Sequence, residues 1–350
     1  MQIDFHHATT YVTARIAGFP HEEADIIAYA AQYVDDATCN GTIRFENKAI
    51  YDRISSAHKA IDPKNLDDLD NQKVWMPFHF LPGNGGADAY EIDDPQEKFI
   101  HKLVCLPESP VAKDMVKAAI LDQDKPYKLH RLGITMHVYA DTWAHQEFAG
   151  VKHRVNNVND IKEIGSSDVF KDGLVNCLIR MTPELGHGRA YIFPDMPFLS
   201  WEYINGHGKR ITRNNTDIFC EAADALCMVM KRYRLRDPDA AVTGIEAKDM
   251  LQIRNLFVNS KKKEGEDRHQ DWTEAIKQGL FSFGSATISY AEDGKDSWKA
   301  QALGSSRDLP EYPYKESFLT SNWKLFHDAL LLHGFTVSHD ILPKYGICAA

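Results

Sequence analysis

The 350-residue sequence has few cysteines, no surplus of positive charge and no apolar run of about 18 residues. Without such a run no segment could cross a bilayer as a helix, and the first residues lack the basic and apolar regions of a signal peptide. We therefore expect a cytoplasmic protein without a membrane span. The six cysteines form no Cys-x-x-Cys pair, which argues against a zinc ribbon or a thiol redox motif. The formal net charge of −10 argues against binding along a nucleic-acid backbone, which favours a basic surface.

Apolar residues and histidines are abundant instead. A hydrophobic fraction of 43% supports a large core, and 16 histidines supply the commonest metal ligand among side chains. Apolar periodicity and helix-start signals predict helices at 8–18, 22–36, 110–122, 129–148, 216–234, 243–261, 266–280 and 321–333. We therefore predict a mainly α protein, a large single-domain helical bundle over residues 1–350. Within it, residues 285–350 could form a separate C-terminal lobe.

Two long segments rich in Pro, Gly, Asn and Asp interrupt the predicted helices. They span residues 62–98 and 183–215, and both read as irregular structure. Loops of this length in a compact domain usually carry function, so we predict that both help to form the site. A short extended stretch is expected at 286–290.

Three candidate metal ligands share one predicted helix. His137, Asp141 and His145 are spaced by four residues, so at about 100° per residue they lie on one helix face. Two imidazoles and a carboxylate suit zinc, manganese or iron better than calcium or magnesium. The flanking residues are largely apolar, and an unpaired carboxylate sheltered from water would be costly. The alternative is a set of buried polar groups that hydrogen-bond within the bundle without any ion.

Four further histidines could complete the site. One of His6 and His7 could supply a ligand while the other serves the fold, although tandem histidines often lie on the surface. His79 lies in an apolar run that enters the first long loop. His187 lies between two glycines, which allow close approach of a ligand.

Two candidate catalytic carboxylates, Asp35 and Asp36, end the predicted helix 22–36. The helix dipole disfavours negative charge at that end, and a bound cation would compensate for it. Either carboxylate could bridge two ions or act as a base, and Asp36 is also a candidate ligand. The alternative is a solvated acidic turn.

The order of these residues resembles the zinc-dependent phospholipase C and S1/P1 nuclease superfamily, all-helical enzymes that hydrolyse phosphodiesters and phosphomonoesters with up to three zinc ions. The resemblance implies a ligand set of His6 or His7, Asp35 or Asp36, His79, His137, Asp141 and His145. The chain lacks that superfamily's N-terminal Trp, whose amino group is a ligand. The superfamily also carries a second His-x-x-x-Asp/Glu after the first, whereas no His from 153 to 207 in this chain has an acid four residues later. We therefore expect one or two ions of zinc, manganese or iron. The chain also resembles, over most of its length, a bacterial family without an assigned activity.

The sequence thus predicts a metal-dependent hydrolase, with small-molecule phosphoesters as the favoured substrates. Arg180, Arg189 or Lys209 could hold a substrate phosphate. One alternative is a non-catalytic helical binding protein with a structural metal site. Others are an HD-type phosphohydrolase, suggested by the His-Asp pairs at 327–328 and 339–340, and a non-haem iron oxidase or oxygenase, because two histidines and a carboxylate also bind iron.

Overall fold

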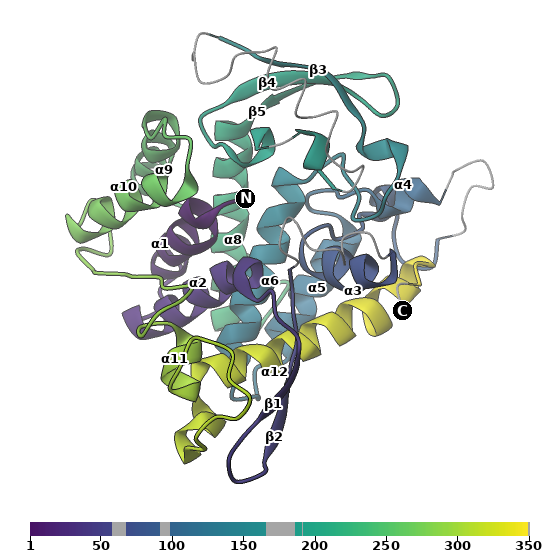
Figure 1. Ribbon diagram of the computed structural model, residues 1–350. Helices are drawn as coiled ribbons and strands as arrows, with labels where there is room; N and C mark the ends of the chain where they lie inside the picture. The colour runs from purple at the N-terminus through teal and green to yellow at the C-terminus, as the bar shows by residue number, and fades with distance from the viewer. Residues whose placement is uncertain (58–67, 92–98, 166–185, 191, 349–350) are drawn as a thin grey trace.

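The computed structural model describes residues 1–57, 68–91, 99–165, 186–190 and 192–348. It is 53% helical and 11% strand, with two small antiparallel sheets, so the architecture is mixed α/β (Figure 1). The prediction of a mainly α bundle was therefore wrong. No helix in the described ranges is long and apolar enough to cross a membrane.

A helix that is buried on all sides organises the molecule. In α6 (Lys128–Ala144), every residue from His130 onward is buried. A helix without an exposed face must lie inside the protein, and Figure 1 shows α6 in the middle of the other helices. It contacts α2 (His21–Asp36), α5 (Pro110–Leu121), α8 (Asn215–Leu235) and α12 (Asn322–Phe335).

Helices α6 and α2 approach each other closely in this core. A Cβ at Gly133 would lie 2.3 Å from the carbonyl oxygen of Ile27, so only glycine fits there. This contact brings the C-terminal end of α2 beside the middle of α6, which places Asp35 near His137. The remaining helices surround this pair: α1 (Thr10–Ile16), α3 (Asp68–Phe78), α4 (Ile100–Leu103), α9 (Ala247–Asn259), α10 (Gly265–Lys277) and α11 (Trp298–Leu303).

The larger sheet overturns the predicted loop at 183–215. Its strands are β3 (Val158–Glu163), β4 (Ser200–Asn205) and β5 (Arg210–Asn214), paired antiparallel in that order. Alternate residues of β4 are buried, with Trp201 and Tyr203 facing the core. That period of two is typical of a half-covered strand. The smaller sheet is a hairpin of β1 (Gly41–Arg44) and β2 (Ile50–Arg53).

Several predicted boundaries differ from the structure. The predicted loop 62–98 contains helix α3, and part of this segment lies outside the described residues. The stretch 286–290, where extended structure was expected, has no strand. Helix α6 ends at Ala144 rather than at residue 148. Side chains from the C-terminal region, including Trp298 and Phe326, share a core cluster with Tyr29 and Tyr33 of α2. The single-domain assignment of 1–350 stays a prediction.

Candidate metal centre

Helix α6 carries the central ligands of the candidate site. His137 and Asp141 are buried one turn apart, and the Asp141 Oδ2 atom lies 3.3 Å from His137 Nε2. His145 follows directly after the last helical residue, and its Nδ1 lies 3.6 Å from the same oxygen. The spacing of four residues therefore brings the three side chains close together, although His145 belongs to a separate set of donors with His187 and Asp195.

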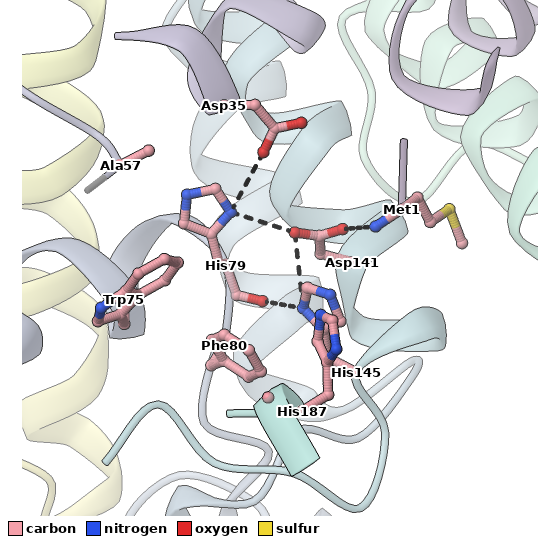
Figure 2. Close-up of a pocket in the computed structure, with 10 residues that line it drawn as sticks. Met1, Asp35, Ala57, Trp75, His79, Phe80, Asp141, His145 and His187 are labelled. Carbon is pink, nitrogen blue, oxygen red and sulfur yellow. Dashed lines mark hydrogen bonds and ion pairs between the residues drawn. The ribbon is translucent and has the colours of Figure 1, made fainter. Parts of the chain in front are cut away.

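Two side chains from other elements reach the same point. His79 follows α3, and its Nδ1 atom lies 3.2 Å from His137 Nε2 and 3.4 Å from Asp141 Oδ2. Asp35, in the last turn of α2, places Oδ1 3.8 Å from both His79 Nδ1 and His137 Nε2. Figure 2 shows His79, Asp35 and Asp141 converging on this point. We call His79, His137 and Asp141 the His79 group.

Backbone carbonyls fix which nitrogen of each imidazole is available. A carbonyl oxygen only accepts hydrogen bonds, so a ring nitrogen bonded to it must carry the hydrogen. His79 Nε2 donates to Ser56 O at 2.9 Å, and His137 Nδ1 donates to Ala31 O at 2.8 Å. In the neutral rings the lone pairs are therefore on His79 Nδ1 and His137 Nε2, the two atoms that face each other. His145 Nδ1 likewise donates to His79 O, which leaves its Nε2 as the donor atom for an ion.

The His79 group fits a metal ion. Two imidazole lone pairs and a carboxylate oxygen repel one another unless a cation or a proton lies between them. Ligands at about 2.1 Å from a tetrahedral zinc ion are about 3.4 Å apart, and the three separations here are 3.2, 3.3 and 3.4 Å. Carbonyl bonds to the second ring nitrogen are also the usual partners of metal-binding histidines.

A second donor group, the His145 group, contains a residue that the sequence did not reveal. It consists of His145, His187 and Asp195, with His187 Nε2 3.7 Å from Asp195 Oδ2. Asp195 is eight residues after His187 and is the last residue of a short 3-10 turn (Phe193–Asp195). A spacing of four residues indicates donors that share one helix face, so it could not reveal Asp195, which lies in a turn. A Pro-Asp step next to Gly-His-Gly in the second long loop was the signal available.

A third group lies on the other side of Asp141. His6 is fully buried in a π-helical turn (Asp4–Thr9), and its Nε2 lies 3.2 Å from Asp141 Oδ1. Neither ring nitrogen of His6 makes a hydrogen bond with the described residues. His6 forms a third set of donors with Asp35 and His137, here called the His6 group. Asp141 therefore directs one oxygen to His6 and the other to the His79 group.

The amino nitrogen of Met1 also lies in the site. It is 2.9 Å from Asp141 Oδ1 and 3.3 Å from Asp195 Oδ1. Burial lowers the pKa of this amine, but Asp141, Asp195 and Asp35 outweigh burial and raise the pKa to about 11. The Met1 amine is therefore a cation that is paired with two carboxylates of the site.

Burial and charge keep His137, His145 and Asp141 in the ionisation states that metal ligands need. Burial lowers the pKa of His137 to about 4 and that of His145 to about 3, so both rings are neutral at pH 7. Burial opposes ionisation of Asp141, but His145 and its other basic neighbours hold the pKa of Asp141 well below its usual range. Burial and the charge of Asp141 raise the pKa of Asp35 well above its usual range.

Two predicted site residues face elsewhere. His7 Nδ1 bonds His269 Nε2 at 2.8 Å, and Asp36 accepts hydrogen bonds from Gln32 and Tyr290. Neither belongs to a donor group among the described residues, so the structure selects His6 over His7 and Asp35 over Asp36. Burial raises the pKa of Asp36 to about 6.

The remaining candidates also lie outside the donor groups. His327 is buried against Trp323, while Asp328 bonds Tyr51 and Lys324, so this pair does not act as one dyad. His339 is exposed, and exposed Lys209 lies in the turn between β4 and β5. Arg180 and the Arg189 side chain lie outside the described part of the chain.

A cavity of about 390 Å³ opens onto the three donor groups (Figure 2). Its walls include Met1, Asp35, His79, Asp141, His145, His187 and the aromatic side chains Trp75 and Phe80. Buried oxygens of Asp141 (Oδ2) and Asp195 (Oδ1) make no hydrogen bond with the described residues, although cationic groups lie nearby. Such orphaned acceptors around one cavity are what a cation would satisfy.

Over residues 1–341 the chain matches the family described as "Family of unknown function (DUF6765)". The chain belongs to this family. The matched span contains all three donor groups of this DUF6765 chain. No curated protein and no solved structure matches it. The family description gives no activity, so the resemblance to the phospholipase C and P1 nuclease superfamily stays a prediction.

Proposed function

We propose that this protein is a metal-dependent hydrolase of phosphoesters. The observation that carries the proposal is the convergence of two imidazole lone pairs and one carboxylate in the His79 group, within 3.4 Å of one another and shielded from water. Buried acceptors facing each other are unfavourable unless a cation lies between them. The nitrogen and oxygen donors favour zinc, with manganese and iron as alternatives.

Each donor group contains three protein ligands, which favours catalysis over a structural role. Structural zinc sites are usually closed by four protein ligands, whereas catalytic sites leave one position open. Bound ions would lower the pKa of a water molecule and neutralise the charge of a phosphoryl group. Asp141 would hold two ions through its two oxygens. Asp35, whose pKa is raised by burial and by Asp141, could keep a proton or accept one at Oδ1 on the cavity wall.

The donor chemistry limits how many ions can bind. His137 has one free lone pair because its Nδ1 is bonded to Ala31 O, so the His79 and His6 groups cannot both use it. We therefore assign one ion to the His79 group and one to the His145 group. A third ion would bind to His6, the Oδ1 atom of Asp141 and Asp35.

The cavity supports a small anionic substrate only if ions are bound. Its described lining residues include no Lys or Arg, and the Met1 amine is already paired with Asp141 and Asp195, so the positive charge for a phosphate would come from the metals. The volume of about 390 Å³ suits a small molecule. Trp75 and Phe80 offer apolar surface to the rest of the substrate. The resemblance to the phospholipase C and P1 nuclease superfamily also supports phosphoesters.

The test combines elemental analysis with hydrolysis of bis(p-nitrophenyl) phosphate and p-nitrophenyl phosphate. The purified protein should carry at least one equivalent of transition metal per chain and should cleave at least one of these esters. Asp141→Ala should lower the metal content at least severalfold and abolish cleavage. His130→Ala is the matched control, because His130 is buried on the same helix but belongs to no donor group.

Other outcomes separate the alternatives. Metal-free wild-type protein, or equal metal content in both variants, would refute the proposal. Bound metal without hydrolysis of either ester would favour a structural ion. Iron together with oxygen consumption would favour an oxidase or oxygenase.

A further inference from the structure

Arg268 of α10 is the most completely engaged buried charge outside the donor groups. Its side chain is fully buried, and its guanidinium forms a two-point ion pair with Asp4, from Nε to Oδ2 at 2.7 Å and from Nη2 to Oδ1 at 3.2 Å. Nη2 also donates to Gln2 Oε1 at 2.6 Å. Nη1 donates to the carbonyl oxygens of Lys262 and Lys263, which precede α10.

These contacts lie on the segment that carries the His6 group. Asp4 is two residues before His6, and Gln2 is four residues before it. The π-helical turn that begins at Asp4 has no side-chain cap of its own. Arg268 also approaches the carbonyl oxygen of Asp195, at 3.5 Å, so it lies behind the His145 group as well. Among the described residues no nitrogen of Arg268 bonds a donor atom of His6 or Asp141, so any effect on the His6 group passes through Asp4 and Gln2.

A π-helical turn is rare, and its hydrogen bonds alone do not specify where the turn begins. The planar guanidinium of Arg268, here called the fork, bonds both oxygens of Asp4, so it fits only one orientation of that carboxylate. A buried ion pair often adds little net stability compared with apolar residues, but it defines geometry strictly. The fork therefore defines the rotation of the turn, which directs His6 towards Asp141 and His7 towards His269.

We propose that Arg268 is a positioning residue that holds the His6 side chain against Asp141 and thereby controls whether the third metal position fills. This inference rests on the proposed metal-dependent function. Arg268 acts from about 260 residues away in the chain, through the ion pair with Asp4.

The experiment measures zinc content at a fixed free zinc concentration and the visible spectrum of the cobalt-substituted protein. Arg268→Gln should lose about one ion per chain relative to wild type, and its cobalt spectrum should match that of His6→Ala. The double variant His6→Ala/Arg268→Gln should lose no more ions than either single variant. Arg268→Lys keeps a charge for Asp4 but not the fork, so it should bind the third ion at least tenfold more weakly than wild type.

The control separates positioning from general stability. Arg131 is also buried and ion-paired, with Asp122, but it contacts no donor group. Arg131→Gln should lower Tm without changing the number of ions or the cobalt spectrum. If both Arg268 variants keep the wild-type ion number and cobalt spectrum, the positioning role is wrong. If Arg268→Gln does not fold, the ion number and spectrum of Arg268→Lys alone test the positioning role. Wild-type protein without zinc would instead refute the proposed function itself.

Discussion

Asp195 shows how one side chain can change the chemistry assigned to a site. Without it, His145 and His187 are two imidazoles beside a cavity; with it they form a three-donor group. We expect Asp195→Ala to lose the ion of the His145 group, about one per chain, while the His79 group keeps its own. Elemental analysis and the cobalt spectrum check this.

The control for Asp195→Ala is Asp249→Ala. Asp249 is a buried aspartate that bonds Ser282 and lies outside the donor groups. The Asp249→Ala protein should retain every ion, but it should be less stable than wild type. Equal ion numbers in Asp195→Ala and wild type would remove Asp195 from the site.

Sequence spacing predicted which side chains of a regular helix lie on one face, and it could not do so for a loop. His137 and Asp141 share a face because the helical repeat is fixed, whereas Asp195 approaches His187 through a turn with no fixed repeat. Adjacent pairs were ambiguous for another reason. Neighbouring helical residues point about 100° apart, so choosing His6 over His7 requires the rotation of the helix, which contacts with the rest of the protein determine.

His327 should make stability depend on pH, independently of the metal groups. Burial lowers its pKa from 6.5 to about 3, and its Nδ1 accepts from the Ile54 N–H. Below about pH 6.5 the unfolded chain takes up the proton while the folded protein does not, so stability is full above that pH and falls towards pH 3. Between pH 7 and 5 this should cost about 2 kcal/mol.

Urea unfolding at the two pH values checks this prediction. His327→Gln, which keeps an acceptor for Ile54, should lose about 2 kcal/mol less than wild type on acidification. His339→Gln removes an exposed histidine near the same end of the chain and should behave like wild type. Equal losses of stability on acidification in wild type and His327→Gln would contradict the predicted role of His327.

At the scale of elements, the contact between α2 and α6 connects packing to the metal site. A Cβ at Gly133 would lie 2.7 Å from the Cβ of Ala30 and 3.1 Å from the backbone nitrogen of Ala31, whose carbonyl fixes His137. We expect Gly133→Ala to separate the helices, destabilise the protein by about 1–3 kcal/mol or more, and weaken metal binding. Urea unfolding and zinc titration measure the two effects.

Gly334→Ala is the comparison for this variant. It adds the same methyl group to α12, where the nearest atom is 3.2 Å away at the tip of the Phe78 ring. That ring can yield slightly, so stability should change little and zinc affinity not at all. Wild-type zinc affinity in a destabilised Gly133→Ala protein would separate the helix contact from the site.

The sequence predicted the long helices, including α2, α6 and α8, because apolar residues that recur at helical spacing over many residues are a strong signal. Strand β4 is six residues long and lies among Gly and Pro residues, so its alternation of Trp201 and Tyr203 was read as part of a loop. Short strands also depend on partners elsewhere in the chain, here β3 and β5, which local patterns do not encode. The prediction of a mainly α fold was wrong for this reason.

Across the whole molecule, folding collects the donors from distant parts of the chain. The donors meet only in the native structure, where His6, Asp35 and His79 approach the donors of α6 and the loop that carries Asp195. An unfolded chain offers no comparable site, so any bound ion stabilises the folded state by mass action. Without ions, the same carboxylates and imidazoles are buried acceptors that face one another.

Removal of metal should therefore destabilise the entire protein. With free zinc about a thousandfold above the dissociation constant, binding contributes about 4 kcal/mol per ion, so a chelator should lower Tm by at least about 5 °C. Added zinc should restore Tm, whereas calcium should not, because the donor set is rich in imidazole. His137→Ala lacks a ligand of the His79 group and should show a much smaller chelator effect. Identical melting curves for the wild type with and without chelator would mean that no ion contributes to its folded state.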